Sequence, residues 1–186
     1  MTLVEAILSM LVATQPFYLD RETVDERTER MKVIATSIVQ ATEESTCTGE
    51  FKQEGCKVKF RGKPEELIVG LFTVAKFETH FAKHVHEDKC RKWECDAGRA
   101  KGLFQIHVSK TVPAELWSKI GGESEESTLL SARAAAAMWS RAWQCGSLEK
   151  AFSGYITSYC RANDEGKRRA KDYRLNLEVF RRLMRK

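Results

Sequence analysis

One glutamate interrupts an apolar stripe. From Pro64 onward, Leu71, Val74 and Phe81 recur at helical spacing, and Glu78 falls on the same stripe. Apolar surroundings raise the pKa of a carboxyl group because they penalise its charged form. A carboxyl that keeps its proton near neutral pH can donate it to a leaving oxygen atom. The alternative is that Glu78, close to the end of the helix, turns to solvent or pairs with a cation.

Two histidines and two cysteines follow Glu78 at spacings that a metal could use. His80 and His84 would share one helix face, and Cys90 and Cys95 come soon afterwards. Two imidazoles and two thiolates can hold a tetrahedral structural zinc ion. The gap between the cysteines is wide for such a site. We therefore expect no metal and no cofactor, and instead histidines that face solvent beside a disulfide.

The six cysteines fall into three pairs that are local in sequence. An even number of cysteines in local pairs predicts disulfides and an oxidising compartment, although six cysteines allow many connectivities. The alternative is six reduced thiols, some of them buried. The favoured pairs are Cys47–Cys56, Cys90–Cys95 and Cys145–Cys160.

Positive charge is concentrated at the C-terminal end. The 186-residue chain has a formal net charge of +5, yet residues 167–186 carry nine Lys or Arg against Asp172 and Glu178. That segment is therefore +7 and the remainder −2. A basic helix attracts any polyanion, whether nucleic acid, acidic lipid or anionic envelope polymers, and composition alone does not choose among them. Disruption of a membrane and a solvated face are the alternatives; no nucleic-acid-binding motif is present, so we expect no specific nucleic acid.

The hydrophobic pattern indicates one predominantly α domain over 1–186, with at most a small hairpin and cysteine-bearing loops. Its parts are N-terminal helices in 1–46, the motif-bearing region 64–160 and the basic helix 167–186. The stretch from Glu43 to Lys63 is expected to be a loop or a hairpin with Phe51, Val58 and Phe60 as strand residues. We expect helices over 1–14, from an Asp20 cap to Ala41 with Val24 on the apolar face, from Pro64 to Phe81 or His84, and over 129–143, 148–159 and 167–184.

Four segments carry a family resemblance. Glu78-Thr79-His80-Phe81 ends a helix, and Gly102-Leu103-Phe104-Gln105-Ile106 follows after a polar loop. An alanine-rich helix from Leu129 to Trp143 and the segment from Leu148 to Tyr155 come next in order. Together they resemble the lytic transglycosylases and goose-type lysozymes, including members such as phage endolysins or virion-associated enzymes. The resemblance covers about half the chain and implies a lysozyme-like helical fold.

The resemblance also implies roles for individual residues. Glu78 would be the catalytic acid, and Tyr155 would lie close to it. Gln105 would offer its amide to a sugar acetamido group, or else form a structural bond within its turn. The expected substrate-binding residues are Thr79, Gly102, Leu103, Phe104, Gln105, Ile106 and Tyr155.

The chain departs from the family pattern at several positions. Thr79 stands where serine is usual, and Phe104 stands where methionine is usual. Ile156 and Ser158 replace an asparagine and a glycine after Tyr155, which removes any polar contact that the asparagine would make.

Two reactions fit one acid. A lytic transglycosylase cleaves the β-1,4 bond between N-acetylmuramic acid and N-acetylglucosamine and closes a 1,6-anhydro ring, with Glu78 as acid and then base. This is the favoured function. A muramidase that inverts the anomeric centre needs a second carboxylate to activate water, for which Asp96 and Asp88 are candidates, although either could be a loop charge. A glycan-binding protein without activity is the remote alternative.

The N-terminus does not resemble a secretory signal peptide, because Met1 to Thr14 has no basic residue before its apolar run and Glu5 interrupts that run. No window holds the roughly 18 apolar residues of a membrane-spanning helix. The resemblance implies a protein that acts on peptidoglycan at the bacterial cell wall, in the periplasm or outside the cell. Without a signal peptide, we expect it to arrive there by another route such as phage delivery. We expect a monomer.

Overall fold

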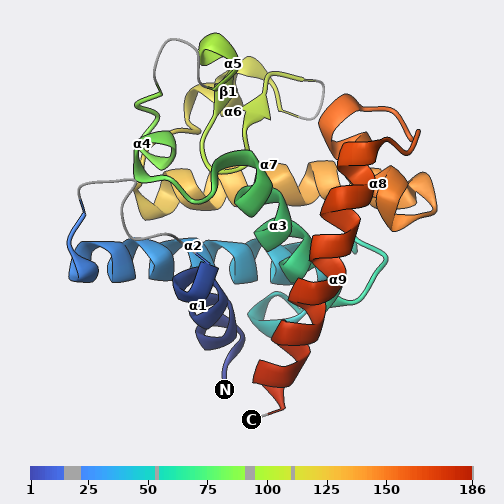
Figure 1. Cartoon of the computed structure of the whole chain (residues 1–186), viewed down its shortest axis with the longest axis horizontal. Coiled ribbons are helices and arrows are strands. Elements are labelled where there is room, and N and C mark those ends of the chain that lie inside the picture. Colours follow the sequence, from blue (N-terminus) through green and yellow to red (C-terminus); the bar gives the residue numbers. More distant parts are fainter. Residues whose placement is uncertain (15–21, 53–54, 91–94, 110–111, 186) are drawn as a thin grey trace.

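The computed structural model describes residues 1–14, 22–52, 55–90, 95–109 and 112–185. It confirms the predominantly α fold with one two-stranded hairpin, in which β1 pairs antiparallel with β2 (Figure 1). The helices are α1 Leu3–Thr14, α2 Val24–Thr46, α3 Pro64–Thr79, α4 Lys83–His86, α5 Cys95–Gly98, α6 Ala114–Ser118, α7 Glu125–Ala142, α8 Leu148–Thr157 and α9 Asp164–Met184; the 3₁₀ turns are η1 Gly49–Phe51 and η2 Trp143–Cys145, and the strands are β1 Ala100–Lys101 and β2 Ile106–His107.

Helix α3 is the central helix. Every residue from Leu67 to Ala75 is buried, as expected of a helix that neighbours enclose on all sides. α2, α7 and α9 pack against it, and α1 packs against both α2 and α9 (Figure 1). At Gly70 the helix passes so close to the buried Trp139 indole of α7 that an added Cβ would lie 2.6 Å from Trp139 Nε1. This packing fixes the axis of α3.

The N-terminal half differs from the sequence prediction at two places. α2 is capped by Thr23, whose side chain accepts a bond from Glu26 N, and Glu26 bonds back to the Thr23 backbone. Asp20, the expected cap, lies outside the described residues. Val24, expected on the apolar face, is 67% exposed because the helix begins there, at the end of the core.

Of the two alternatives for the stretch from Glu43 to Lys63, a loop or a hairpin, the described residues show the loop. α2 continues to Thr46, and the described residues that follow contain a 3₁₀ turn and no strand. Lys59 N and Phe60 N both donate to Ser45 O, so the chain returns to the end of α2 instead of pairing with itself. Phe60 is buried against Trp143.

The later elements are close to the predictions. The actual hairpin joins 100–101 to 106–107, and the short helix α6 was not predicted. Asn163 caps α9, in which Tyr173 and Phe180 are buried. α3 stops at Thr79, because His80 adopts a left-handed conformation with φ +48°.

All three predicted disulfides are confirmed. Cys47–Cys56, Cys90–Cys95 and Cys145–Cys160 are bonded. Each closes a short loop beside a helix or turn terminus. None of the helices in the described part of the chain is long and apolar enough to cross a membrane.

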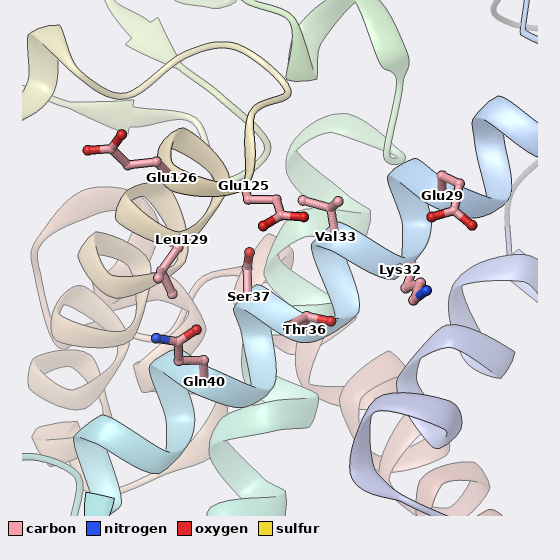
Figure 2. Close-up of a pocket in the computed structure, with 9 residues that line it drawn as sticks. All are labelled: Glu29, Lys32, Val33, Thr36, Ser37, Gln40, Glu125, Glu126 and Leu129. Atoms are coloured by element: carbon pink, nitrogen blue, oxygen red, sulfur yellow. The ribbon is translucent and has the colours of Figure 1, made fainter. Parts of the chain in front are cut away.

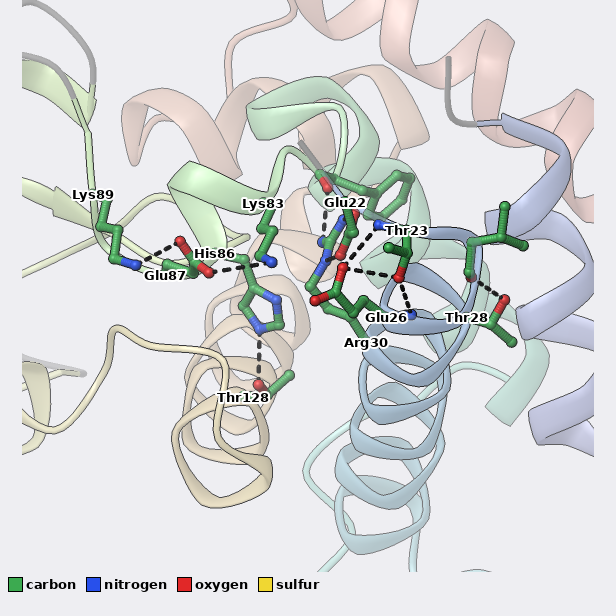
Figure 3. A network of polar contacts seen from close by, with 12 residues as sticks. Glu22, Thr23, Glu26, Thr28, Arg30, Lys83, His86, Glu87, Lys89 and Thr128 are labelled. Carbon is green, nitrogen blue, oxygen red and sulfur yellow. Dashed lines mark hydrogen bonds and ion pairs between the residues drawn. The ribbon is translucent and has the colours of Figure 1, made fainter. Parts of the chain in front are cut away.

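A buried histidine joins α4 to the start of α7. His86 is 2% exposed, and its Nε2 lies 2.8 Å from Thr128 Oγ1 (Figure 3). Thr128 Oγ1 donates to Ser124 O, so it accepts from His86 Nε2–H. Burial, and after it the charge of Arg30, lower the pKa of His86 from 6.5 to about 3.

We expect His86 to make the fold sensitive to acid. Between about pH 6.5 and about pH 3 the unfolded chain binds a proton on this ring and the folded chain does not, so stability falls as pH falls. The slope from this group approaches about 1.4 kcal/mol per pH unit. His86→Gln, which keeps a donor and does not titrate, should lose less stability between pH 7 and pH 4.5 in urea denaturation. Equal losses in the two proteins would contradict the assignment.

Candidate active site

The expected catalytic glutamate opens onto a cleft of about 560 Å³. The cleft lies where the end of α3 meets the hairpin region, α7 and α8. Four of the residues singled out from the sequence line it, namely Glu78, Gln105, Tyr155 and Asp96. Its other lining residues are Ala100, His107, Val108, Ser109, Met138, Ile156 and Ser158.

Glu78 has a cationic partner. Its side chain is 20% exposed, and its Oε1 accepts a bond from Arg169 Nη1 of α9. Arg169 is 6% exposed, donates also to Glu165 Oε1 at 2.7 Å and lies over the Phe77 ring. The interpretation of Glu78 as a carboxyl isolated among apolar side chains is therefore wrong, and the alternative, a pair with a cation, is what the structure shows. Helical spacing within 64–81 could not reveal this partner, because it comes from a helix about 90 residues further on.

Thr79 is a buried structural support of the cleft. It is buried, and its Oγ1 lies 3.0 Å from Ala75 O and 3.2 Å from Leu103 O. The same oxygen accepts a bond from Phe81 N at 3.2 Å. Thr79 does not line the cleft, so the structure gives it a bracing position, not the expected place on the substrate surface.

Only one residue of the segment 102–106 reaches the cleft. Gly102, Leu103, Phe104 and Ile106 are all buried and form the support of the turn. Gln105, at φ +46°, lines the cleft. Its Nε2 donates to Gly102 O at 3.1 Å and to Cys95 Sγ at 3.4 Å, which is the structural bond left open as an alternative. Its Oε1 bonds to no residue that the structure describes and is the atom open to a ligand.

Tyr155 lies beside Glu78, as the resemblance implied. Its hydroxyl donates to Phe104 O at 3.2 Å, which links α8 to the turn that carries Gln105. Burial, and after it the negative charge of Glu78, raise the pKa of Tyr155 well above its ordinary value. The phenol therefore remains neutral at physiological pH.

The two candidate second carboxylates lie in different surroundings. Asp96 lines the cleft, and its Oδ2 is 3.4 Å from His107 Nε2. Asp88 does not line the cleft; it pairs with Lys101 at 3.1 Å and lies against Gly121. His107 was not singled out from the sequence, because a histidine after an apolar run has no distinctive spacing. Asp96 is therefore the carboxylate that shares the space of Glu78.

The cysteines of the alternative zinc site are not available as metal ligands. Cys90 and Cys95 are joined in a disulfide and have no thiolate to offer. Within the described ranges, no group of three His, Cys, Asp or Glu side chains is placed to hold a metal ion.

A buried ion pair holds the chain reversal after Glu78 (Figure 3). Arg30 of α2 makes two bonds to the Glu22 carboxylate, at 2.7 and 2.9 Å, with both side chains at most 4% exposed. Its Nη1 also donates to Phe81 O at 2.9 Å. Because Phe81 follows the last turn of α3, this bond fixes where that helix ends and where Glu78 points.

Comparison with known proteins adds no assignment. No family model, no curated protein and no solved structure matches the chain. The site must therefore be judged on its own geometry.

We expect Arg30→Met to destabilise the fold strongly. It would remove the two bonds to the buried Glu22 carboxylate and the bond to Phe81 O, and leave a buried carboxylate without its cation, a loss of about 3–5 kcal/mol. Arg133→Met is the matched control, because Arg133 also pairs with a glutamate, Glu44, but is 43% exposed and should cost about 1 kcal/mol or less. Urea denaturation measures both, and similar losses would contradict the role given to Arg30.

Proposed function

We propose that the protein cleaves peptidoglycan glycan strands at the β-1,4 bond between N-acetylmuramic acid and N-acetylglucosamine, as a lytic transglycosylase. The observation that carries the proposal is the convergence of Glu78, Gln105 and Tyr155 on one cleft. They come from three separate segments, and the family resemblance names all three. A chance resemblance of local motifs gives no reason for such a convergence.

The proposed reaction uses Glu78 twice. As an acid it gives its proton to the glycosidic oxygen while the bond to the muramoyl anomeric carbon breaks. As a carboxylate it then takes the proton from the muramoyl 6-hydroxyl, whose oxygen bonds to that carbon and closes the 1,6-anhydro ring. No water is consumed, and Glu78 ends the cycle with its proton restored.

The first step needs Glu78 in its protonated form. A protonated carboxyl no longer forms an ion pair, but its Oε1 can still accept a hydrogen bond from Arg169 Nη1 while Oε2 carries the proton. Arg169 keeps Glu165 as an ionised partner in that state, which avoids an unpaired buried cation.

A hydrolytic muramidase is the second candidate. The observation that favours it is the position of Asp96, a carboxylate on the same cleft with His107 beside it. In that reaction Asp96 takes a proton from the water that attacks the anomeric carbon. A glycan-binding protein without activity is the third and remote candidate.

The proposal places the protein at the bacterial wall as a monomer, in a periplasmic or extracellular setting that suits three disulfides. The basic helix α9 would contact anionic envelope polymers. Much of its charge is already paired, since Lys167, Arg168, Arg174 and Arg181 contact carboxylates. Among the described residues, Lys171 and Arg182 of α9, and Arg185 just after it, remain without such a partner and would make the contact.

Product mass decides between the two reactions. We expect digestion of purified peptidoglycan to give muropeptides that end in 1,6-anhydro-muramic acid, one water lighter than hydrolysis products. Reducing ends would instead support the muramidase, and no cleavage of a verified substrate would support the binding protein.

We expect Glu78→Gln to lower turnover about 100-fold or more, since an amide cannot donate the proton. Arg169 keeps Glu165, so the variant should fold. Glu149→Gln is the matched control, because Glu149 likewise pairs with an arginine of α9, Arg174, but lies outside the cleft. The assignment fails if Glu78→Gln retains turnover, or if both variants lose it equally.

Asp96→Asn and Asp88→Asn test the second carboxylate. For a transglycosylase, neither change should lower kcat more than about threefold. For a muramidase, Asp96→Asn should abolish turnover and Asp88→Asn should not, because only Asp96 lies on the cleft.

A further inference from the structure

The cleft of Glu78 has an apolar rim. Val108 and Ile156 line the cleft, one just after β2 and the other on α8, and they are 53% and 41% exposed. Tyr159 follows the cleft residue Ser158 along the chain and is 74% exposed. Single exposed apolar side chains are ordinary on a protein surface, but several of them beside one groove are typical of a binding site.

A groove elsewhere on the molecule has a different lining. It has a volume of about 390 Å³ and lies between α2 and the first turns of α7 (Figure 2). Most of the described residues that line it are polar or charged, and its apolar residues, Val33 and Leu129, are half-buried. Large exposed apolar side chains are therefore a property of the cleft beside Glu78 and not of this other groove.

The need to bury aromatic rings does not account for Tyr159. The rings of Tyr155 and Tyr173 lie against the buried Trp139, and their hydroxyl groups donate to backbone carbonyls. Both rings thus contribute to the core. Tyr159 lies largely in water, where an aromatic ring adds little to the stability of the fold.

The backbone that carries Tyr159 is held on both sides. Before it, Thr157 Oγ1 donates to Ser153 O at 2.8 Å and accepts a bond from Tyr159 N at 3.3 Å. After it, Cys160 is bonded to Cys145 of η2. A tyrosine on such a backbone has only its side-chain torsions to fix when a ligand binds, so its contact area costs little conformational entropy.

We propose that Tyr159, together with Ile156 and Val108, forms an aromatic platform on which an outer sugar of a bound glycan stacks. A pyranose ring gathers C–H bonds on one face, and that face packs against the negative face of an aromatic ring. The polar groups at the edge of the sugar remain in water. The platform rests on the proposed function only in that the cleft binds a β-1,4 glycan; it does not depend on how the glycan is cleaved.

Calorimetric titration with the β-1,4 hexamer of N-acetylglucosamine tests the platform. Full-length Glu78→Gln protein is the parent, because it should not consume the ligand. We expect saturable binding that Tyr159→Ala weakens about tenfold and Tyr159→Phe leaves unchanged, since phenylalanine keeps the ring face. Absence of hexamer binding, or equal binding by the parent and Tyr159→Ala, would overturn the proposal. So would an equal loss in Tyr159→Phe, which would indicate a bond of the hydroxyl group instead of stacking.

Val108→Ala and Val58→Ala are a matched pair of variants. The two valines are 53% and 57% exposed, but Val108 lines the cleft and Val58 does not. Val108→Ala should weaken hexamer binding about threefold, because it removes apolar contact area, and Val58→Ala should leave it unchanged. Equal effects of the two changes would contradict the placement of the platform.

Turnover separates the platform from the proposed function. On soluble peptidoglycan strands, Tyr159→Ala in the wild-type background should raise KM and change kcat less than about twofold, because the platform contacts a sugar away from the bond that breaks. A lower kcat with unchanged KM would overturn the platform and leave the enzyme assignment intact. Hexamer binding that depends on Tyr159, in a protein that cleaves no peptidoglycan, would support the platform and refute the enzyme assignment.

Discussion

The buried guanidinium of Arg30 is the constraint on which the candidate site depends. It bonds to the Glu22 carboxylate, just before α2, and to Phe81 O, just after α3. Taking an arginine out of water is unfavourable unless its donors are satisfied, and here three of its bonds go to these two partners. The pair therefore forms only when the start of α2 and the end of α3 are both in place. Because Glu78 lies in the last turn of α3, its position is coupled to the assembly of the core.

The turn that faces Glu78 is tied by neutral hydrogen bonds. Thr79 Oγ1 reaches Leu103 O, and Tyr155 OH reaches Phe104 O. Each such bond contributes about 1 kcal/mol, but both act on one short segment. Gln105 lies at the next position and is held in an unusual conformation by its neighbours. The cleft is thus preorganised by bonds below its surface, and most residues of the family-like motifs are structural supports for the few that reach it.

The sequence predicted those features that depend on interactions within one segment of the chain. The disulfides and the start of α3 at Pro64 both follow from residue types and spacing within one segment. The sequence did not predict what depends on contacts between distant segments. The Arg169 partner of Glu78 comes from another helix, and the bond of Phe60 N to Ser45 O belongs to the loop alternative, which the sequence could not separate from a hairpin. Periodicity shows that Glu78 lies near the core but cannot show which charge it meets there.

The backbone around the cleft offers an argument that does not depend on family resemblance. Left-handed conformations at residues other than glycine cost about 1 kcal/mol or more, and they cluster where function maintains them. In the described chain such residues include Phe81, which follows the last turn of α3, and Asp96 and Gln105, which line the cleft. His80 and Ser158 are less informative, because left-handed residues commonly end helices. Phe81 is held by the bonds of its N to Thr79 Oγ1 and of its O to Arg30, and Gln105 is held by its bond to Gly102 O within the turn. Asp96 and Gln105 line the cleft, so the bonds that hold the rarely adopted backbone at Gln105 also set where its side chain meets the space beside Glu78.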